Sequence, residues 1–196
     1  CLRWFLSRRS TSLYLWRETK FEPWGDVYHL CNGEPHREDD LPAVEKVDGA
    51  RHWYQRGKLH RANDKPAVID ADGALLWFYN GELHRDGDRP AIFGLEGTQL
   101  WYQYGHQHRD EDLPAVVHAD GTREWYQNGQ RHRDGDYPAV VRREGTQSWY
   151  KHDRLHRAND LPAIIWFDGS REWYQHNNRH RANDRPAFIG ADGDLQ

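Results

Sequence analysis

The chain repeats a pattern every 24 residues, and this strict period constrains its fold more than any other feature. An acidic residue with glycine, an Asp-x-Pro-Ala segment and a tryptophan followed by a second aromatic residue all recur at this interval. A His-Arg pair recurs with them, beginning at His36, His60, His84, His108, His132, His156 and His180. We therefore expect seven tandem units over residues 25–196, preceded by a non-repeating cap or arm at residues 1–24.

The turn residues of each unit indicate β-hairpins. One position is always Gly, Asp or Asn, the residues that best tolerate positive φ. Its occupants are Gly33, Gly57, Gly81, Gly105, Gly129, Asp153 and Asn177. The acidic residue and glycine at the other end of each unit predict a second two-residue turn. The pattern favours an all-β fold, an elongated antiparallel β-meander built as a single-layer twisted sheet or a β-solenoid.

The first turn predicts which residues face one another. With Asn128-Gly129 as a two-residue turn, Gln127 pairs with Gln130, and Trp125 lies opposite His132. Each tryptophan is thus expected beside the histidine of its own unit, packed on it. The histidine is expected to donate a hydrogen bond as well.

The second turn extends this register to the preceding strand. With Asp120-Gly121 as a two-residue turn, Trp125 lies opposite Val116, and Tyr126 points to the other face beside Ala115. Proline lacks an amide hydrogen, so each Asp-x-Pro segment should mark a kink before a return strand.

These motifs resemble the MORN repeat from about residue 25 to the end of the chain. The segment Trp125 to His132, Trp-Tyr-Gln-Asn-Gly-Gln-Arg-His, followed by Glu144-Gly145, has the aromatic residue, Asn-Gly turn, histidine and later acidic-Gly pair of that family. The chain departs from it where Arg and then Asp-x-Pro-Ala follow the histidine, and its period is about one residue longer. The resemblance is to a divergent class associated with large DNA viruses and some bacteria. It implies a long curved sheet used for scaffolding, self-association or membrane-proximal attachment, without catalytic residues.

The repeated histidines and acidic loops do not predict a metal site. Histidines one unit apart should be separated by about 10 Å or more, too far to share a metal held by bonds of about 2.1 Å. Loops such as Asp86-Gly87-Asp88 suggest calcium, but Ala62-Asn63-Asp64 offers too few carboxylates. We expect the loop aspartates to accept bonds from loop amides or a nearby arginine, for example Asp112 from Arg109. No metal or cofactor is predicted.

The His-Arg-Asp set does not predict an enzyme. Acid-base and nucleophilic sites need one asymmetric constellation, whereas seven similar units supply seven similar environments. The chain also has no nucleophile motif and no Gly-rich phosphate loop.

The second aromatic residue of each unit supplies the candidate binding residues. A single-layer sheet must expose one face, and a regular row of rings there could bind an extended peptide, a glycan or a second copy of the chain. The row comprises Tyr54, Phe78, Tyr102, Tyr126, Tyr150 and Tyr174. The alternative is that these rings pack on Ala, Val and arginine stems within the same face.

Charge and cysteine content limit the partners. A net charge of -4 and a pI near 6.4 disfavour nucleic acid. Residues 1–20 are basic and aromatic, so they predict either a membrane-surface arm or a solvated cap. The two cysteines, Cys1 and Cys31, form no disulfide framework and favour a cytoplasmic or virion-associated location.

Together these features predict a noncatalytic repeat scaffold. Its partner should be another protein or a second copy, in a viral particle or another assembly, and a small-molecule ligand is disfavoured. The alternative is a glycan- or membrane-binding module that uses the aromatic row and the basic arm.

Overall fold

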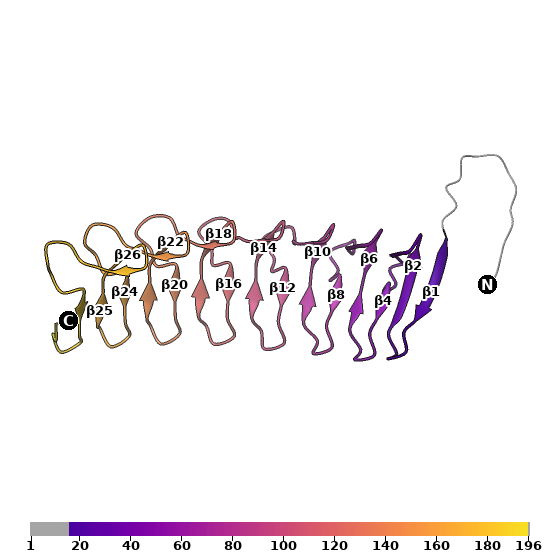
Figure 1. Cartoon of the computed structure of the whole chain (residues 1–196), viewed down its shortest axis with the longest axis horizontal. Helices are drawn as coiled ribbons and strands as arrows, with labels where there is room; N and C mark the ends of the chain where they lie inside the picture. The colour runs from indigo at the N-terminus through magenta and orange to yellow at the C-terminus, as the bar shows by residue number, and fades with distance from the viewer. Residues whose placement is uncertain (1–15, 196) are drawn as a thin grey trace, which may run out of the picture.

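The computed structural model describes residues 16–195 as an elongated body built from short β-strands (Figure 1). Within these residues no α-helix is present, and hence none that could cross a bilayer. The prediction of an all-β antiparallel meander is confirmed. The sheet is open, with its strands side by side along the whole length of the body.

Sixteen strands form the main sheet, in which each complete unit contributes two strands. The first four, at the N-terminal end, are β1 (Arg17–Phe21), β2 (Val27–Cys31), β3 (Glu34–Pro35) and β4 (Val44–Glu45). The central strands are β5 (Arg51–His52), β8 (Val68–Ile69), β9 (Leu75–Leu76), β12 (Ile92–Phe93), β13 (Gln99–Leu100), β16 (Val116–Val117) and β17 (Arg123–Glu124). The last five are β20 (Val140–Val141), β21 (Gln147–Ser148), β24 (Ile164–Ile165), β25 (Arg171–Glu172) and β28 (Phe188–Ile189). Neighbours are antiparallel throughout, and β3 pairs with β2 beside the main path.

Six separate two-stranded hairpins lie in a row beyond one end of the sheet's strands, at the top of Figure 1. They are β6 (Tyr54–Gln55) with β7 (Lys58–Leu59), β10 (Phe78–Tyr79) with β11 (Glu82–Leu83), β14 (Tyr102–Gln103) with β15 (His106–Gln107), β18 (Tyr126–Gln127) with β19 (Gln130–Arg131), β22 (Tyr150–Lys151) with β23 (Arg154–Leu155), and β26 (Tyr174–Gln175) with β27 (Asn178–Arg179). Each hairpin follows the buried tryptophan of its unit.

The hairpin register is confirmed. Gln127 pairs with Gln130, and the amide of His132 donates to the carbonyl of Trp125 at 3.1 Å. Asn128 and Gly129 have φ values of 49° and 81°, as a two-residue type I′ turn requires.

The prediction of a two-residue turn at Asp120-Gly121 is wrong by one residue. The His118 amide donates to the Thr122 carbonyl at 2.9 Å across a three-residue loop, and the amide of Gly121, whose φ is 94°, donates to the His118 carbonyl at 2.9 Å. The Asp120 carboxylate accepts the Thr122 amide at 2.8 Å, which explains why an aspartate is used here. A glycine at the left-handed position is typical of three-residue hairpin loops.

This extra residue shifts the pairing of the preceding strand. Val116 pairs with Glu124, so this register places Trp125 opposite Ala115 and not opposite Val116. Because a shift of one residue exchanges the two faces of a strand, Tyr126 shares its side with Val116 and not with Ala115.

The core is thin and lies on both sides of the sheet. Six tryptophans, from Trp53 to Trp173, are 5–8% exposed. The alanine after each proline is fully buried, at 0% exposure, from Ala43 to Ala163. Such complete burial indicates that these methyl groups are closely packed.

The N-terminal edge strand of the described residues is β1, which pairs with β2 from Arg17↔Cys31 to Phe21↔Val27. Part of the expected N-terminal cap is therefore a strand. Residues 1–15 of the cap, with most of the predicted basic arm, lie outside the described residues.

Candidate functional site

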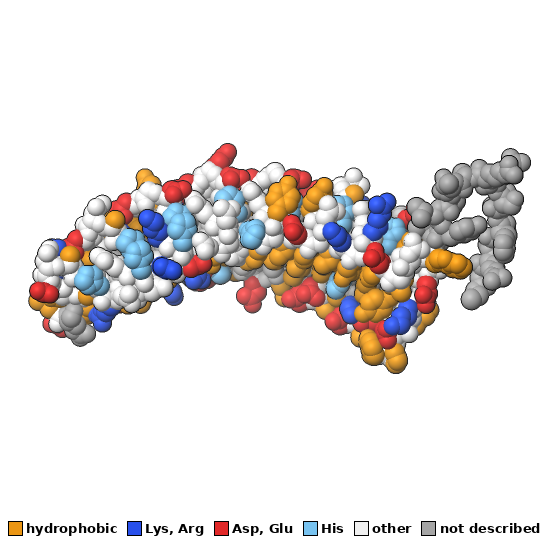
Figure 2. Space-filling model, turned by 45° about the horizontal axis from the view of Figure 1, so that its top comes forward, with side chains coloured by type: hydrophobic (Ala, Val, Ile, Leu, Met, Phe, Trp, Pro, Cys, Tyr) orange, Lys and Arg blue, Asp and Glu red, His pale blue; other side chains and the backbone are white. Residues whose placement is uncertain are grey.

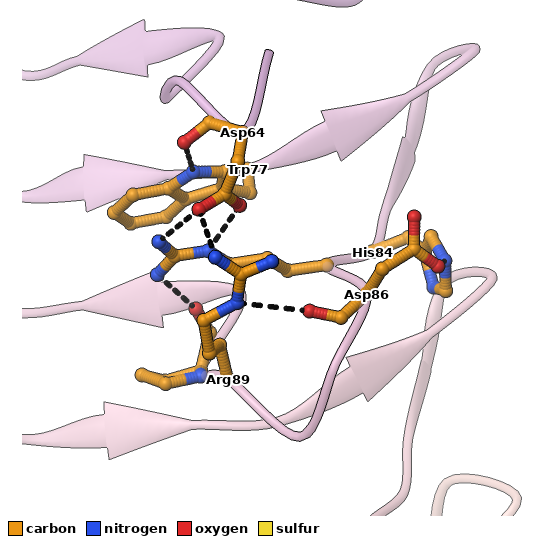
Figure 3. Close-up of polar contacts among 7 residues, drawn as sticks. Asp64, Trp77, His84, Asp86 and Arg89 are labelled. Atoms are coloured by element: carbon orange, nitrogen blue, oxygen red, sulfur yellow. Dashed lines mark hydrogen bonds and ion pairs between the residues drawn. The ribbon is translucent and has the colours of Figure 1, made fainter. Parts of the chain in front are cut away.

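The loops between hairpin and sheet build a polar cluster that joins successive units (Figure 3). The guanidinium carbon of Arg85 lies 3.7 Å from the ring centroid of Trp77, within the same unit. Arg85 also donates two bonds, of 2.8 and 2.9 Å, to the Asp64 carboxylate of the preceding unit, and a third to the Pro90 carbonyl. The Asp64 carbonyl accepts the indole N–H of Trp77 at 3.0 Å.

The backbone of the loop explains this arrangement. Asn63 and Asp64 have φ values of 59° and 54°, and this left-handed pair turns both the carboxylate and the carbonyl of Asp64 toward the next unit. Asn, Asp and Gly are the residues that adopt this conformation at least cost. The Arg85 bonds lower the pKa of Asp64 below its ordinary value, so the pair stays ionised near neutral pH.

The same contact recurs along the array and corrects the expected partner of Asp112. Asp112 receives Arg133 of the next unit, whereas Arg109 bonds to Asp88 of the preceding one. The full set of pairs is Arg61 with Asp40, Arg85 with Asp64, Arg109 with Asp88, Arg133 with Asp112, Arg157 with Asp136 and Arg181 with Asp160. We call these residues, with the tryptophans beneath the arginines, the Trp–Arg–Asp ladder.

The histidines do not pack on their tryptophans, because the arginines occupy that position. Their rings contact the hairpin turn of the next unit instead. His84 stacks on Tyr104 with ring centroids 4.3 Å apart, and His132 stacks on His152 at the same distance. Figure 2 shows histidine side chains in a row along the array.

Where the turn residue is not aromatic, the histidine makes a polar contact. The amide of Asn128 approaches Nδ1 of His108 at 3.4 Å, and Nε2 of the same ring donates, as expected of these histidines, to the Asp110 carboxylate at 3.0 Å. The next amide in the turn, that of Gly129, donates to the Gln107 carbonyl of the preceding unit at 2.9 Å. The histidine row therefore connects one hairpin to the next.

The six predicted binding residues lie on the opposite side of the strands from the tryptophans, and all six are half-buried. We call this face the tyrosine side. It also carries a continuous cross-strand row with Val44, His52, Val68, Leu76, Ile92, Leu100, Val116, Glu124, Val140, Ser148, Ile164 and Glu172. The structure brings the six rings into one row, but it exposes them less than a bare sheet face would.

Several of these rings are held by neighbouring side chains. The Tyr126 hydroxyl donates to Glu124 at 3.0 Å, and Tyr174 does the same to Glu172 at 2.9 Å. Burial and the nearby Glu124 charge raise the pKa of Tyr126 to about 12. The Tyr126 phenol is therefore a neutral hydrogen-bond donor at physiological pH.

A charged cluster around Glu124 was not anticipated from the sequence. The half-buried carboxylate accepts bonds from His118 at 2.9 Å and from Nε of Arg131 at 2.9 Å, in addition to the Tyr126 hydroxyl. Burial alone opposes ionisation of Glu124, but these donors prevail and lower its pKa. His118, Glu124 and Arg131 occupy variable positions of the unit, so the repeat pattern gave no signal for them.

Within residues 16–195 no group of three or more His, Cys, Asp or Glu side chains is arranged to hold a metal ion. The acidic loops instead direct one aspartate to an arginine. In some units the other binds histidine and glutamine, as Asp110 does with His108 and Gln103. Such contacts hold loops in place.

No protein-family model matches the chain, and no curated protein matches its sequence significantly.

Proposed function

We propose that the protein is a noncatalytic repeat scaffold of a MORN-like kind, acting through protein contacts or self-association in an assembly such as a viral particle. The observation that carries the proposal is the Trp–Arg–Asp ladder. In this ladder an arginine of nearly every unit bonds to an aspartate of the preceding unit, so the recurring polar residues join successive units. A rod with a continuous row of half-buried rings is suited to holding an extended partner along its length.

The charged groups on the described surface favour this reading over catalysis. The arginine and aspartate that recur from unit to unit are paired within the array, and each unit repeats nearly the same environment. An acid-base mechanism needs groups whose surroundings push their pKa values apart at one place. The MORN resemblance adds the expectation of scaffolding and stays part of the proposal.

The test is a triple variant in which Tyr102, Tyr126 and Tyr150 become Ser. We expect it to lose assembly, measured by analytical ultracentrifugation, or binding of a protein partner identified by cross-linking. A matched control changes Arg51, Arg123 and Arg171, which lie on the opposite side of the strands, to Ser. Circular dichroism must show both variants folded.

The proposal is wrong if the purified wild-type chain stays monomeric at all concentrations and cross-links to no partner. It is equally wrong if the tyrosine variant, once shown to be folded, assembles as the wild type does.

A further inference from the structure

The cross-strand row on the tyrosine side contains one small residue among large ones. The positions two residues before the six rings are occupied by His52, Leu76, Leu100, Glu124, Ser148 and Glu172. Ser148 is 7% exposed and pairs with Val140 on one neighbouring strand and with Ile164 on the other. Because a serine is smaller than any of the other five, the row is locally underfilled.

A recess of about 310 Å³ lies beside this position. Ser148, Val140 and Glu124 line it, together with Arg131 and Tyr150 from two successive hairpins. Ligand cavities usually span about 300–1,000 Å³, so this one is of a size for a single small ring system. It is open to solvent, as a subsite for one residue of a longer polymer must be.

The recess offers both hydrogen-bond donors and acceptors. Glu124 holds Nε of Arg131, while the two terminal amino groups of that guanidinium have no bonding partner among residues 16–195. The guanidinium carbon lies 5.6 Å from the Tyr150 ring centroid. Ser148 and Tyr150 contribute hydroxyl groups to the same lining.

The charges around the recess nearly cancel. Two cationic side chains, Arg131 and Arg142, face three carboxylates, Asp120, Glu124 and Glu144, with His118 beside them. Neither a strong anion nor a strong cation is favoured by such a balance. A neutral ligand rich in hydroxyl groups suits it better, because each hydroxyl both donates and accepts.

We propose that this recess is a saccharide-binding subsite that takes one neutral sugar residue of a glycan. Arg131 and Ser148 donate to its hydroxyls, the rim carboxylates accept from them, and Tyr150 contacts an apolar edge of the sugar. The site goes beyond the proposed scaffolding function, although it shares Tyr150 with the row of rings, because it depends on Ser148, whereas the equivalent positions of the other five units carry larger side chains.

The test uses an array of immobilised neutral glycans with the full-length chain, followed by saturation-transfer NMR with the free sugars that bind. The decisive variant is Ser148→Leu. Leucine occupies the equivalent position at Leu76 and Leu100, between similar aliphatic neighbours, so the fold accommodates it. We expect glycan affinity to fall at least about tenfold in this variant, with the melting temperature unchanged or raised.

A matched control is Ser148→Ala, which removes the hydroxyl but keeps the recess, and should weaken binding only a few-fold. Failure of the wild-type chain to bind any glycan on the array overturns the proposal. Undiminished glycan binding by the leucine variant overturns it too. Neither result bears on assembly, which the tyrosine variant tests.

Discussion

The two sides of the sheet differ in how closely they follow the repeat. On the tryptophan side, the indole, guanidinium and carboxylate recur with nearly the same contacts in six successive pairs of units. On the tyrosine side, equivalent positions hold leucine, histidine, serine or glutamate. The difference indicates that one side maintains the stacking of units, while the other is free to differ from unit to unit.

The physical cause is the number of contacts each position must satisfy at once. Arg85 stacks on a ring, forks onto a carboxylate and bonds a carbonyl, so no other side chain could replace it. Leu76 and Glu124 occupy half-exposed positions with one open side. Either an apolar side chain that packs or a polar side chain that forms hydrogen bonds can stand at such a position.

The largest expected effect is the loss of a central indole. Trp125→Ala should lower the free energy of unfolding by about 3–5 kcal/mol, because it removes a buried ring and the surface on which Arg133 stacks. Tyr126→Ala, in the next position on the half-buried side, should cost clearly less. Urea denaturation measures both variants. An equal loss in the two would remove the distinction between the sides.

A smaller effect is expected from converting the Glu124 cluster to the apolar pattern of another unit. Arg131→Leu alone should cost about 1–3 kcal/mol, because it leaves a half-buried carboxylate short of a partner. The double variant Glu124→Leu with Arg131→Leu should return to within about 1 kcal/mol of the wild type. Leu76 and Leu83 already form this apolar combination two units earlier. The double-mutant cycle is measured by denaturation, and a double variant as unstable as the single one would contradict this account.

One rung of the ladder can be compared with an unpaired equivalent. Asp112→Asn keeps a residue suited to positive φ but removes the charge that Arg133 binds, and should cost about 1 kcal/mol given the partial exposure of Asp112. Asp184→Asn is the control, since no arginine of residues 16–195 bonds to Asp184, and we expect almost no change. High salt should reduce the difference in melting temperature between the variants. If both substitutions had the same effect, the carboxylates would not act through the arginines.

The smallest effect concerns pH and follows from two half-buried histidines. Burial lowers the pKa of His52, and burial with nearby His176 and Lys151 lowers that of His156, from 6.5. The unfolded chain then binds more protons, so this contribution is complete above about pH 6.5 and falls as the pH drops toward the folded-state pKa. Denaturation at about pH 7.5 and about pH 5 measures it.

His52→Leu should reduce this pH dependence, because it removes the titrating group. The equivalent position of two other units already carries leucine, at Leu76 and Leu100. Arginine bonds lower the pKa of Asp64 and Asp88, so these two aspartates lose their stabilising charge only below about pH 3.8 and do not obscure the histidine window. A wild-type stability independent of pH between the two conditions would contradict the prediction.

Much of the fold was predictable because turn residues act locally. Asn128-Gly129 defines its hairpin through the φ values that these two residues accept, so the register of Gln127 and Gln130 followed directly. At Asp120-Gly121 the same reasoning placed Trp125 opposite the wrong residue. A glycine at positive φ ends a three-residue loop as readily as it forms part of a two-residue turn.

The candidate site was predictable only in outline. The six rings do form one row, as alternation along a strand requires, but their half-burial depends on neighbours such as Glu124 and Arg131 from other strands. Nothing in the sequence indicated the recess at Ser148, because the recess depends on the size and placement of the side chains around this serine in space.

The sequence by itself determined the period, the positions of the turns and the antiparallel meander, since glycine, asparagine and proline limit the backbone wherever they stand. Only the tertiary structure decided that Arg133 crosses to Asp112 of the preceding unit, and that histidine rings contact the next hairpin and not their own tryptophans. Such contacts join residues about one period apart, and a strict repeat presents identical partners before and after each unit. The direction of every link therefore depends on how the units stack in space.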